Sequence, residues 1–367
     1  MGKKVRIGII GVGIIGKHHL RTYAEIEDAE VVALADIDEA EGARVAELFG
    51  IPNVYNNGYK MLERDDLDAV DICLHNNLHM PGAAAVMRAG CNAYCEKPMA
   101  GTYKDAEAML KVAEETGQLL HIQLATLYRP ETKAAKYLID GGHLGNVYHA
   151  RSTGFRRRGR PYVDGFGTFN FVRKEISGGG AFYDMGVYHI SQILYLLGNP
   201  EVVSITGKTF QETPIDPRRR EIGQYSVEEL GMGFVRLENN IAMDIIESWA
   251  IDLDGFAGSY VVGSEGGVRL EPFGYYHNIG DLEFNATANL DQFIYRQHNV
   301  HEIGDIYDSS QHHWVAVNQG RADLLPTASV ALKTMLISEG IYLSEKLGRE
   351  LCADEVREMS ESKAIDI

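Results

Sequence analysis

The stretch KKVRIGIIGVGIIGKHHLRTYAEIEDAEVVALAD, residues 3–36, decides the fold of the first half of the chain. An apolar run from Val5 to Ile10 leads into a turn with three glycines, and a second run from Val31 to Ala35 ends on Asp36. Short apolar runs bounded by glycine are typical of buried strands, and the segment between these two has room for a helix. The order strand, glycine turn, helix, strand, acid predicts a dinucleotide-binding βαβ unit.

The glycine turn GVGIIG matches the needs of such a unit residue by residue. Gly11 permits the tight turn, and Gly13 lets a pyrophosphate approach the backbone because no Cβ stands in the way. Gly16 lets the helix pack closely on the strand. Ile14 and Ile15 lie at the start of the helix, whose unpaired N–H groups and partial positive charge face the phosphates. We therefore expect Gly11 to Gly16 to bind the cofactor.

The acid at the end of the second run bears on which cofactor is bound. Asp36 lies 20 residues after Gly16, where a carboxylate can hold the ribose hydroxyls of NAD. Asp36 and Asp38 would both repel a 2′-phosphate, and Ile37 offers no cation for one. A GxGxxG motif alone also occurs in purely structural turns, but here the strand, the helix and the acid agree with a cofactor site. The sequence therefore predicts NAD rather than NADP.

Composition narrows the class of protein. The chain has 367 residues, more than one core usually serves, and 45% of them are hydrophobic. The net charge of −17 argues against nucleic acid or an anionic membrane surface as a partner. No apolar stretch reaches the roughly 20 residues that span a bilayer, and because the first expected strand begins at Val5 we expect no signal peptide. The four cysteines lack the spacing of metal ligands. We therefore expect them to be reduced thiols that pack inside a cytoplasmic protein: Cys73, Cys91, Cys95 and Cys352.

The first half continues in a strand–helix rhythm. Asp68–Leu74 is an almost continuous apolar run that ends on polar residues, a pattern typical of a buried parallel strand whose C-terminal end faces a ligand crevice. The next strand, Asn92–Cys95, ends on Glu-Lys-Pro at 96–98. Further helices are expected at 40–49, 81–89 and 103–116, and further strands at 51–55 and 119–124. We predict a Rossmann domain over residues 1–122.

The second half of the chain has a different pattern of predicted strands and helices. Strands follow one another through hairpin-type turns, which predicts an open, mainly antiparallel sheet in an α+β domain over residues 123–367. The expected strands are 147–155, 201–209, 228–237, 241–251 and 258–263. One long helix, about 181–197, interrupts the start, and another, about 328–347, closes the domain. We expect this domain to bind the substrate, and the free face of its sheet to form subunit contacts.

With these motifs in place, the chain resembles the glucose–fructose oxidoreductase, inositol dehydrogenase and rhizopine-catabolism (Gfo/Idh/MocA) oxidoreductases over nearly all of its length. The resemblance rests on GVGIIGKHH at 11–19, HNNLHMP at 75–81, CEKP at 95–98, GGGAFYDMG at 178–186 and YLSEKLGR at 342–349. It implies an NAD(P)-dependent enzyme acting on sugars, polyols or related carbohydrates. It also implies a Rossmann domain, an open-sheet second domain, and a homodimer or homotetramer.

The chemistry of such a reaction points to Lys97. Moving a hydride from a carbinol carbon to nicotinamide requires removal of the hydroxyl proton, so a polar group must lie at the substrate oxygen. Lys97 follows a strand end at the crevice, where its cation can hold that oxygen and lower the pKa of a neighbouring acid. The alternative is a surface lysine on a turn. We expect Glu96 to orient Lys97 or the cofactor rather than to react.

A second group of candidates follows the GGG segment. In a helix, Asp184 and Tyr188 are i and i+4 on one face, while His189 is rotated off that face. Many members of the family carry histidine at the i+4 position, and others carry tyrosine there. We interpret Tyr188 as the proton donor or acceptor and Asp184 as the positioning residue. His189 is the rival, because its ordinary pKa near 6.5 suits a general base better than the value near 10 of tyrosine. A local helix irregularity could bring it in, or it could merely pack beside Gln192.

Weaker signals surround these residues. Asn76 and His79 are expected to border the nicotinamide ribose, and Leu-Tyr-Arg-Pro at 127–130 departs from the family pattern. The basic segment RRRGR at 156–160 fits either a solvated or subunit-bridging loop or the recognition of an acidic or phosphorylated sugar. The aromatic stretch at 162–171 could stack on a sugar ring or simply pack. We expect no metal, since nothing fixes the geometry of the late histidines: His298, His301, His312 and His313.

These observations lead to one main functional hypothesis and two alternatives. The main one is an NAD-dependent dehydrogenase that oxidises a secondary hydroxyl of a sugar, sugar derivative or cyclitol. One alternative is an enzyme of the same family that holds NAD tightly and recycles it within the reaction. The other is a nonenzymatic NAD-binding sensor, which would not need a proton-transfer group at the crevice.

Overall fold

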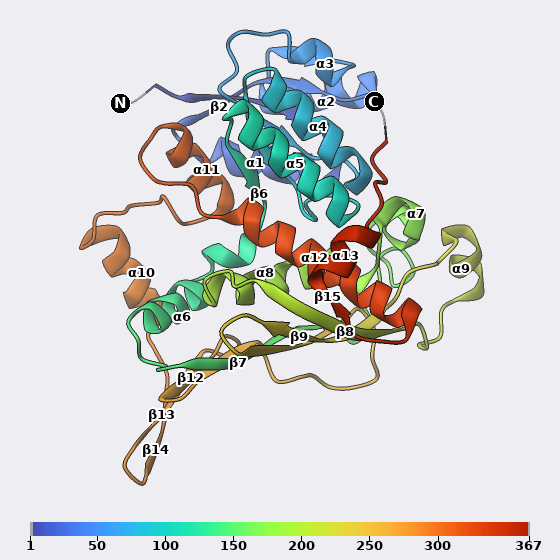
Figure 1. Cartoon of the computed structure of the whole chain (residues 1–367). Helices are drawn as coiled ribbons and strands as arrows, with labels where there is room; N and C mark the ends of the chain where they lie inside the picture. The colour runs from blue at the N-terminus through green and yellow to red at the C-terminus, as the bar shows by residue number, and fades with distance from the viewer. Residues whose placement is uncertain (1–2, 366–367) are drawn as a thin grey trace.

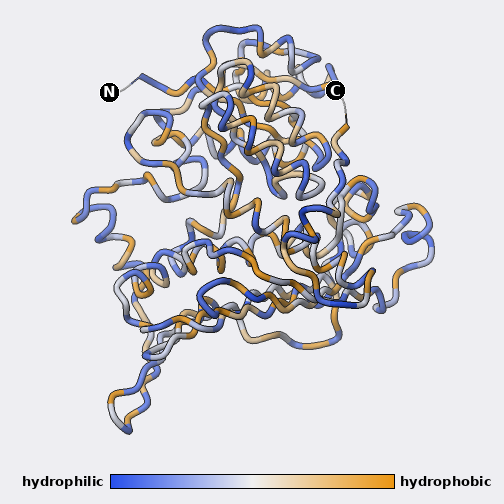
Figure 2. The backbone as a smooth tube through the Cα atoms, viewed as in Figure 1, coloured by the Kyte–Doolittle hydropathy of each residue, from blue (hydrophilic) through white to orange (hydrophobic). Residues whose placement is uncertain are grey.

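The computed structural model describes residues 3–365 and contains two units, each built on one sheet. In Figure 1 the first unit lies above, in blue to teal, and the second lies below, in green to red. Figure 2 shows hydrophobic positions gathered inside the upper unit and along the helices between the two sheets. Among the described residues, no helix is long and apolar enough to cross a membrane.

The first sheet has six parallel strands in the order β3-β2-β1-β4-β5-β6, the doubly wound arrangement that the sequence predicts. Its strands are β1 (Val5–Ile10), β2 (Ala29–Ala35), β3 (Asn53–Tyr55), β4 (Ala69–Ile72), β5 (Asn92–Cys95) and β6 (Leu120–Ile122). Its helices are α1 (Ile14–Ala24), α2 (Glu39–Phe49), α3 (Gly58–Met61), α4 (Asn76–Arg88) and α5 (Tyr103–Thr116). The Rossmann fold is therefore confirmed.

Close backbone contacts explain two of the three turn glycines. Gly11 has a φ of +89°, and a Cβ on it would lie 2.4 Å from the carbonyl oxygen of Cys73. A Cβ on Gly16 would lie 2.1 Å from the carbonyl oxygen of Gly11. Both approaches are too short for any side chain, so the turn itself requires these glycines.

Helix α4 begins five residues before the predicted start at Pro81, so proline lies inside the helix. Proline has no N–H to donate to the carbonyl four residues earlier, which here belongs to Asn77. The backbone N–H of Ile365 donates to that carbonyl instead, at 3.1 Å. The C-terminal segment thus completes a hydrogen bond that Pro81 leaves open.

The second sheet has nine strands in the order β14-β13-β12-β11-β7-β10-β9-β8-β15. Its strands are β7 (Val147–Phe155), β8 (Val202–Phe210), β9 (Leu230–Leu237), β10 (Ile241–Ser248), β11 (Tyr260–Gly263), β12 (Gly266–Arg269), β13 (Gly274–Ile279), β14 (Leu282–Ala286) and β15 (Leu351–Cys352). The sheet is mainly antiparallel, as predicted, and only β7 pairs with β10 in parallel. The predicted strands correspond to β7–β11, while β12–β15 were not foreseen.

Helices cover one face of this sheet and leave the other open (Figure 1). They are α6 (Pro130–Asp140), α7 (Lys174–Ser177), α8 (Val187–Leu196), α9 (Pro217–Gly223), α10 (Leu290–Asn299), α11 (Ser310–Asn318), α12 (Thr327–Leu347) and α13 (Ala353–Met359), with 3₁₀ turns η1 (Ala125–Tyr128) and η2 (Phe169–Val172). Helix α12 packs on β8, and α8 packs on β7. The predicted single helix at 181–197 is instead a π-helical turn, η3 (Phe182–Gly186), followed by α8.

Late parts of the chain return to the first unit. Trp314 of α11 is buried in one cluster with Val5 and Tyr94 of the first sheet. Near the end of the chain, Ser362 Oγ and the Lys363 N–H donate to the carboxylate of Asp105. The division at residue 122 stays a proposal, and it assigns to the second domain two segments that pack on the first.

Candidate active site

The mouth of the glycine turn is open where a pyrophosphate would lie. A Cβ on Gly13 would meet nothing within 4 Å, unlike those on Gly11 and Gly16. Beside it, Ile14 is 73% exposed and Ile15 is 37% exposed, although both are large apolar side chains. Packing within the chain therefore does not explain this glycine, whereas a phosphate group at the N-terminus of α1 does.

The carboxylate of Asp36 lies directly beside this turn. Its Oδ2 accepts from the Val12 N–H at 2.8 Å, and its Oδ1 accepts from the Asp38 N–H at 2.9 Å. Asp38 in turn caps α2 by accepting from the Glu41 N–H. Ile37, between the two acids, is 93% exposed and brings no cation. The residues present thus fit a ribose diol, as in NAD, better than a 2′-phosphate.

The structure separates the two residues that were expected to border the ribose. His79 is fully buried, with Nδ1 2.7 Å from the Pro98 carbonyl and Nε2 3.0 Å from the Leu74 carbonyl. It therefore braces the loops after β4 and β5, and its place beside the nicotinamide ribose stays a prediction. Asn76 is half-buried and donates from Nδ2 to the Ser177 carbonyl at 2.7 Å, so it also joins the two units.

Lys97 lies where the first unit meets the second. Its Nζ donates to the Asp184 carbonyl at 2.8 Å and to Asp184 Oδ1 at 3.1 Å. The same ammonium lies 4.6 Å from the centre of the Tyr188 ring, in cation–π geometry. Burial lowers the pKa of Lys97, but Tyr188, Asp184 and Glu96 raise it, and the net shift is upward. Lys97 is therefore a stable cation held among side chains of both units.

Glu96 is buried and supports Lys97 through the backbone. Its Oε2 accepts from the Lys97 N–H at 3.0 Å, and its Oε1 lies 2.9 Å from His19 Nε2. Both carboxylate oxygens thus have partners inside the protein. Of the two predicted tasks, this geometry fits the orientation of Lys97 and does not fit a direct contact with the cofactor.

Asp184 joins three donors from distant parts of the chain. Besides Lys97, Trp249 Nε1 donates to its Oδ2 at 3.0 Å and Arg156 Nη1 lies 3.4 Å from the same oxygen. Burial raises the pKa of Asp184, but Lys97 and Arg156 lower it, so the group is ionised. Sequence reasoning missed Trp249 and left Arg156 undecided, because each directly follows a strand, β10 or β7, that is remote from Asp184 along the chain.

Tyr188 faces the first unit, at the side of Lys97. Its hydroxyl lies 3.5 Å from Gln123 Oε1, just after β6. Burial raises the pKa of Tyr188 to about 12, although Lys97 acts in the opposite direction. The expected lowering by Lys97 is therefore present, but burial outweighs it. At neutral pH the hydroxyl keeps its proton.

His189 faces the second sheet and is paired with a carboxylate. Its Nδ1 lies 2.9 Å from Oε2 of Glu247, which is fully buried on β10. Burial lowers the pKa of His189, but Glu247 raises it, and the net shift is upward. In the π-helical turn η3 the helix widens just before α8, which is the irregularity that could bring His189 toward the site. The side chain of Gln192, beside which His189 could pack, donates to Thr132 Oγ1 at 2.7 Å.

The GGG segment is required by the packing around the start of this turn. A Cβ on Gly180 would lie 2.0 Å from the carbonyl oxygen of Glu228, and one on Gly179 would lie 2.2 Å from Tyr342 Oη. The buried Glu228 carboxylate accepts from the N–H groups of Gly180 and Phe182 and from the Tyr342 hydroxyl. A carboxylate at this end of a helix satisfies unpaired donors and complements the helix dipole. The segment therefore anchors the turn that carries Asp184.

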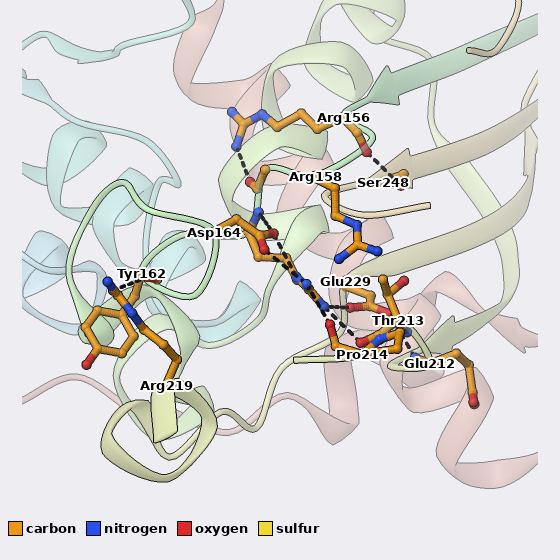
Figure 3. Close-up of polar contacts among 12 residues, drawn as sticks. Arg156, Arg158, Tyr162, Asp164, Glu212, Thr213, Pro214, Arg219, Glu229 and Ser248 are labelled. Atoms are coloured by element: carbon orange, nitrogen blue, oxygen red, sulfur yellow. Dashed lines mark hydrogen bonds and ion pairs between the residues drawn. The ribbon is translucent and has the colours of Figure 1, made fainter. Parts of the chain in front are cut away.

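The arginines of the basic segment 156–160 differ in their surroundings (Figure 3). Arg160 is buried, and its guanidinium pairs with Asp164 at 2.8 Å and Glu229 at 2.8 Å. It also donates to the carbonyls of Thr213 and Pro214. Arg158 lies exposed at the rim. The segment is thus neither a wholly solvated loop nor a continuous cationic patch.

The late histidines are dispersed, and they serve local contacts. His298 Nε2 lies 2.7 Å from Asp308, and the buried His313 accepts from the Leu325 N–H at 3.1 Å. Within residues 3–365, the one close group of metal-ligand types consists of His19, Asp71 and Cys73, in the first unit. In the 127–130 segment, which departs from the family pattern, Arg129 Nη1 lies 2.5 Å from Glu271 Oε1.

Comparison with known proteins agrees with this geometry. A family model described as an oxidoreductase family with an NAD-binding Rossmann fold matches residues 5–124, and one described as the GFO/IDH/MocA C-terminal domain matches residues 132–269. The chain is 29% identical over 287 residues to a D-glucoside 3-dehydrogenase from Escherichia coli (strain K12), covering 76% of this chain and 80% of that protein. It is 25% identical over 355 residues to a D-apiose dehydrogenase from Paraburkholderia graminis, covering 95% and 89%.

A solved structure extends the likeness to the whole fold. A levoglucosan dehydrogenase in complex with NADH and levoglucosan superposes with a TM-score of 0.81, covering 95% of this chain and 99% of that one. The two sequences are 20% identical, so this likeness concerns the fold.

Proposed function

Since the chain belongs to the Gfo/Idh/MocA oxidoreductases and is an NAD-dependent dehydrogenase acting on CH–OH groups, we propose that it oxidises a secondary hydroxyl of a sugar, sugar derivative or cyclitol. Bound NAD supplies the hydride acceptor of this reaction. The glycine turn from Gly11 to Gly16 would hold the pyrophosphate, and Asp36 would hold the adenosine ribose. The relatives named for a glucoside and for apiose support a carbohydrate substrate.

The observation that carries this proposal is the position of Lys97. Its ammonium lies against both Asp184 and Tyr188 at the edge of the first sheet where the strands end. A cation there holds the substrate oxygen and stabilises negative charge that develops on it. Asp184, fixed by Trp249 and Arg156, holds the ammonium in place and can accept from a second substrate hydroxyl.

For the proton we propose Tyr188 as the group at the reacting oxygen, because its ring contacts Lys97. With a pKa of about 12, its hydroxyl is a proton donor at neutral pH, which suits reduction of a carbonyl. In the oxidising direction it takes the hydroxyl proton only after losing its own, so alkaline pH favours oxidation. Lys97 assists by stabilising the phenolate.

His189 is the competing general base in this proposal. Its contact with the buried Glu247 fixes one ring nitrogen and leaves the other, among the described residues, without a hydrogen-bond partner in the protein. This arrangement of a histidine oriented by a carboxylate is common to general bases on unrelated folds. If His189 is the base, the oxidation rate should stop rising with pH above the pKa of His189. If Tyr188 is the base, the rate should keep rising toward the pKa of Tyr188, which is about 12.

A homodimer or homotetramer joined through the open face of the second sheet remains part of the proposal, as does a cytoplasmic location. Exposed apolar side chains lie on strands of that sheet, among them Val203, Met232 and Phe234. Light scattering at micromolar concentration tests the assembly, and a monomer would contradict it.

The substrate class is tested by a screen of sugars, glycosides and cyclitols with NAD, followed through the absorbance of NADH. We expect turnover with at least one neutral carbohydrate and stronger activity with NAD than with NADP. Activity without added cofactor, together with NAD retained through purification, would favour the NAD-recycling enzyme instead. Binding of NAD with no turnover of any compound would favour the sensor.

A further inference from the structure

Three ionisable side chains lie buried behind Lys97 and take no part in the mechanism above. His19 comes from α1, Asp71 from β4 and Glu96 from the end of β5, and all three are buried. His19 Nδ1 lies 2.9 Å from Asp71 Oδ2, and His19 Nε2 lies 2.9 Å from Glu96 Oε1. Each ring nitrogen of the histidine thus faces a carboxylate.

This geometry favours the protonated form of His19. A neutral imidazole has one N–H donor and one lone pair, so between two carboxylates it would aim the lone pair at an anion. An imidazolium donates to both. Burial lowers the pKa of His19, but Asp71 raises it, and the net value is well above the ordinary one. Burial likewise raises the pKa of Glu96, and His19 and Lys97 lower it below its ordinary value.

The other groups that face His19 leave this charge balance unchanged. Cys73 Sγ lies 3.4 Å from Nδ1, and burial raises the pKa of that thiol far above neutral. Tyr94 packs edge-on at 5.7 Å between ring centres, and burial raises its pKa and that of Tyr23 on α1. His18 lies beside the ring at 6.3 Å between centres. The cluster of His19, Asp71 and Glu96 therefore has a net charge of minus one.

The cluster is connected to the active site through one peptide group. The second oxygen of Glu96 accepts from the Lys97 N–H at 3.0 Å, so a hydrogen-bonded chain runs from Asp71 through His19 and Glu96 to Lys97. We propose that His19 is a positioning residue for Lys97: as an imidazolium it holds the Glu96 carboxylate, which fixes the backbone from which the Lys97 side chain extends. The charge state is independent of the function proposed above, and the positioning role rests on that function.

The charge state is tested without any substrate. In the full-length protein labelled with ¹⁵N at histidine, and with His19→Gln to identify the signal, both ring nitrogens of His19 should remain protonated at about pH 8.5, where an ordinary histidine is neutral. A neutral ring at that pH would overturn the proposal. So would one equivalent of bound metal that His19→Gln releases, because His19, Asp71 and Cys73 would then be metal ligands.

The positioning role is tested by the pH profile of oxidation, with methyl β-D-glucopyranoside and NAD as the probe. The net charge of the cluster becomes −2 in His19→Gln and zero in Glu96→Gln, and it returns to −1 in the double variant His19→Gln with Asp71→Asn. Since Glu96 raises the pKa of Tyr188 and His19 lowers it, the rising limb of the rate profile should move to higher pH in His19→Gln and to lower pH in Glu96→Gln. Each shift should be about half a pH unit or more, and the double variant should return near the wild type. Shifts in one direction, or none, would overturn the role.

A second comparison isolates the peptide contact and covers variants that fold poorly. Glu96→Gln keeps an acceptor for the Lys97 N–H, whereas Glu96→Ala removes it, so kcat should fall about tenfold further in the alanine variant, with NADH binding unchanged in both. Equal kcat values would overturn the role of Glu96. If the wild type does not oxidise the glucoside, the substrate part of the proposed function fails with this probe, while the ¹⁵N measurement still decides the charge of His19.

Discussion

The two sides of the active site are built by different means. On the side of the first unit, close backbone contacts and a buried ionic chain fix the glycine turn and Lys97. On the side of the second unit, the segment 156–172 depends on one buried arginine and leaves Phe166, Phe169 and Phe171 exposed. The difference shows which side can vary. The proposed cofactor contacts and Lys97 lie on the side fixed by the backbone, and the segment that we propose contacts the substrate lies on the other.

The largest expected effect concerns the arginine that holds this segment. Arg160→Met removes the partner of Asp164 and of the buried Glu229, and an uncompensated buried charge costs about 3 kcal/mol or more of unfolding free energy. Urea unfolding measures this loss. Arg158→Met is the matched control, because Arg158 is exposed and its ion pair at 3.7 Å contributes little. Similar stability in both variants would show that Arg160 does not hold the segment.

The next effect tests the fixed side. Lys97→Ala should lower kcat by about 10² or more, since it removes the cation at the substrate oxygen, and should leave NADH binding nearly intact. Tyr188→Phe should lower kcat to a similar degree, and the double variant should add little because the two groups act as a unit. Additive losses would mean that the Lys97–Tyr188 contact is not part of the reaction.

The identity of the proton acceptor is read from the pH profile. If Tyr188 accepts the proton, the oxidation rate should keep rising with pH through the alkaline range, because the pKa of about 12 lies above it. His189→Asn should then preserve this rise at a modest cost in kcat. A plateau above the raised pKa of His189 that disappears in His189→Asn would identify His189, with Glu247, as the base. Rates at matched ionic strength from pH 6 to about 10 distinguish the two.

A smaller effect is expected at the cofactor. Asp36→Ala combined with Ile37→Arg removes the carboxylate beside the glycine turn and adds a cation at an exposed position. The ratio of kcat/KM for NADP to that for NAD should rise about tenfold or more. A wild-type enzyme that prefers NADP would contradict the role of Asp36 before any variant is made.

The same contrast explains what the sequence could predict. The first sheet, β7–β11 and the set Lys97, Asp184 and Tyr188 follow from apolar runs and short motifs, which are local signals. Strands β12–β15 are short or polar and have no such signal. Arg156 and Trp249 meet Asp184, and Glu247 meets His189, only through pairing of the second sheet, and the π-helical turn has no local marker. The burial of His19 between two carboxylates likewise depends on tertiary packing, since the sequence alone fits equally a side chain that reaches the pyrophosphate or the mouth of the active site and a solvated helix residue.

The smallest expected effect concerns the variable side. The guanidinium of Arg156 lies 5.3 Å from the centre of the Phe166 ring and 3.4 Å from Asp184 Oδ2, so Phe166 borders the site through one side chain. Phe166→Ala removes a cation–π contact of about 0.5–1 kcal/mol, which corresponds to a change of two- to fivefold. If this loop contacts the substrate, the change should appear as a higher KM for the carbohydrate, with kcat and the KM for NAD unaltered. Phe171→Ala is the matched control, because Phe171 is similarly exposed on the same segment and has no contact with Arg156 among the described residues. An equal effect of both variants would assign the loss to general loosening of the segment, and a change in kcat alone would place Phe166 with the groups that hold Asp184.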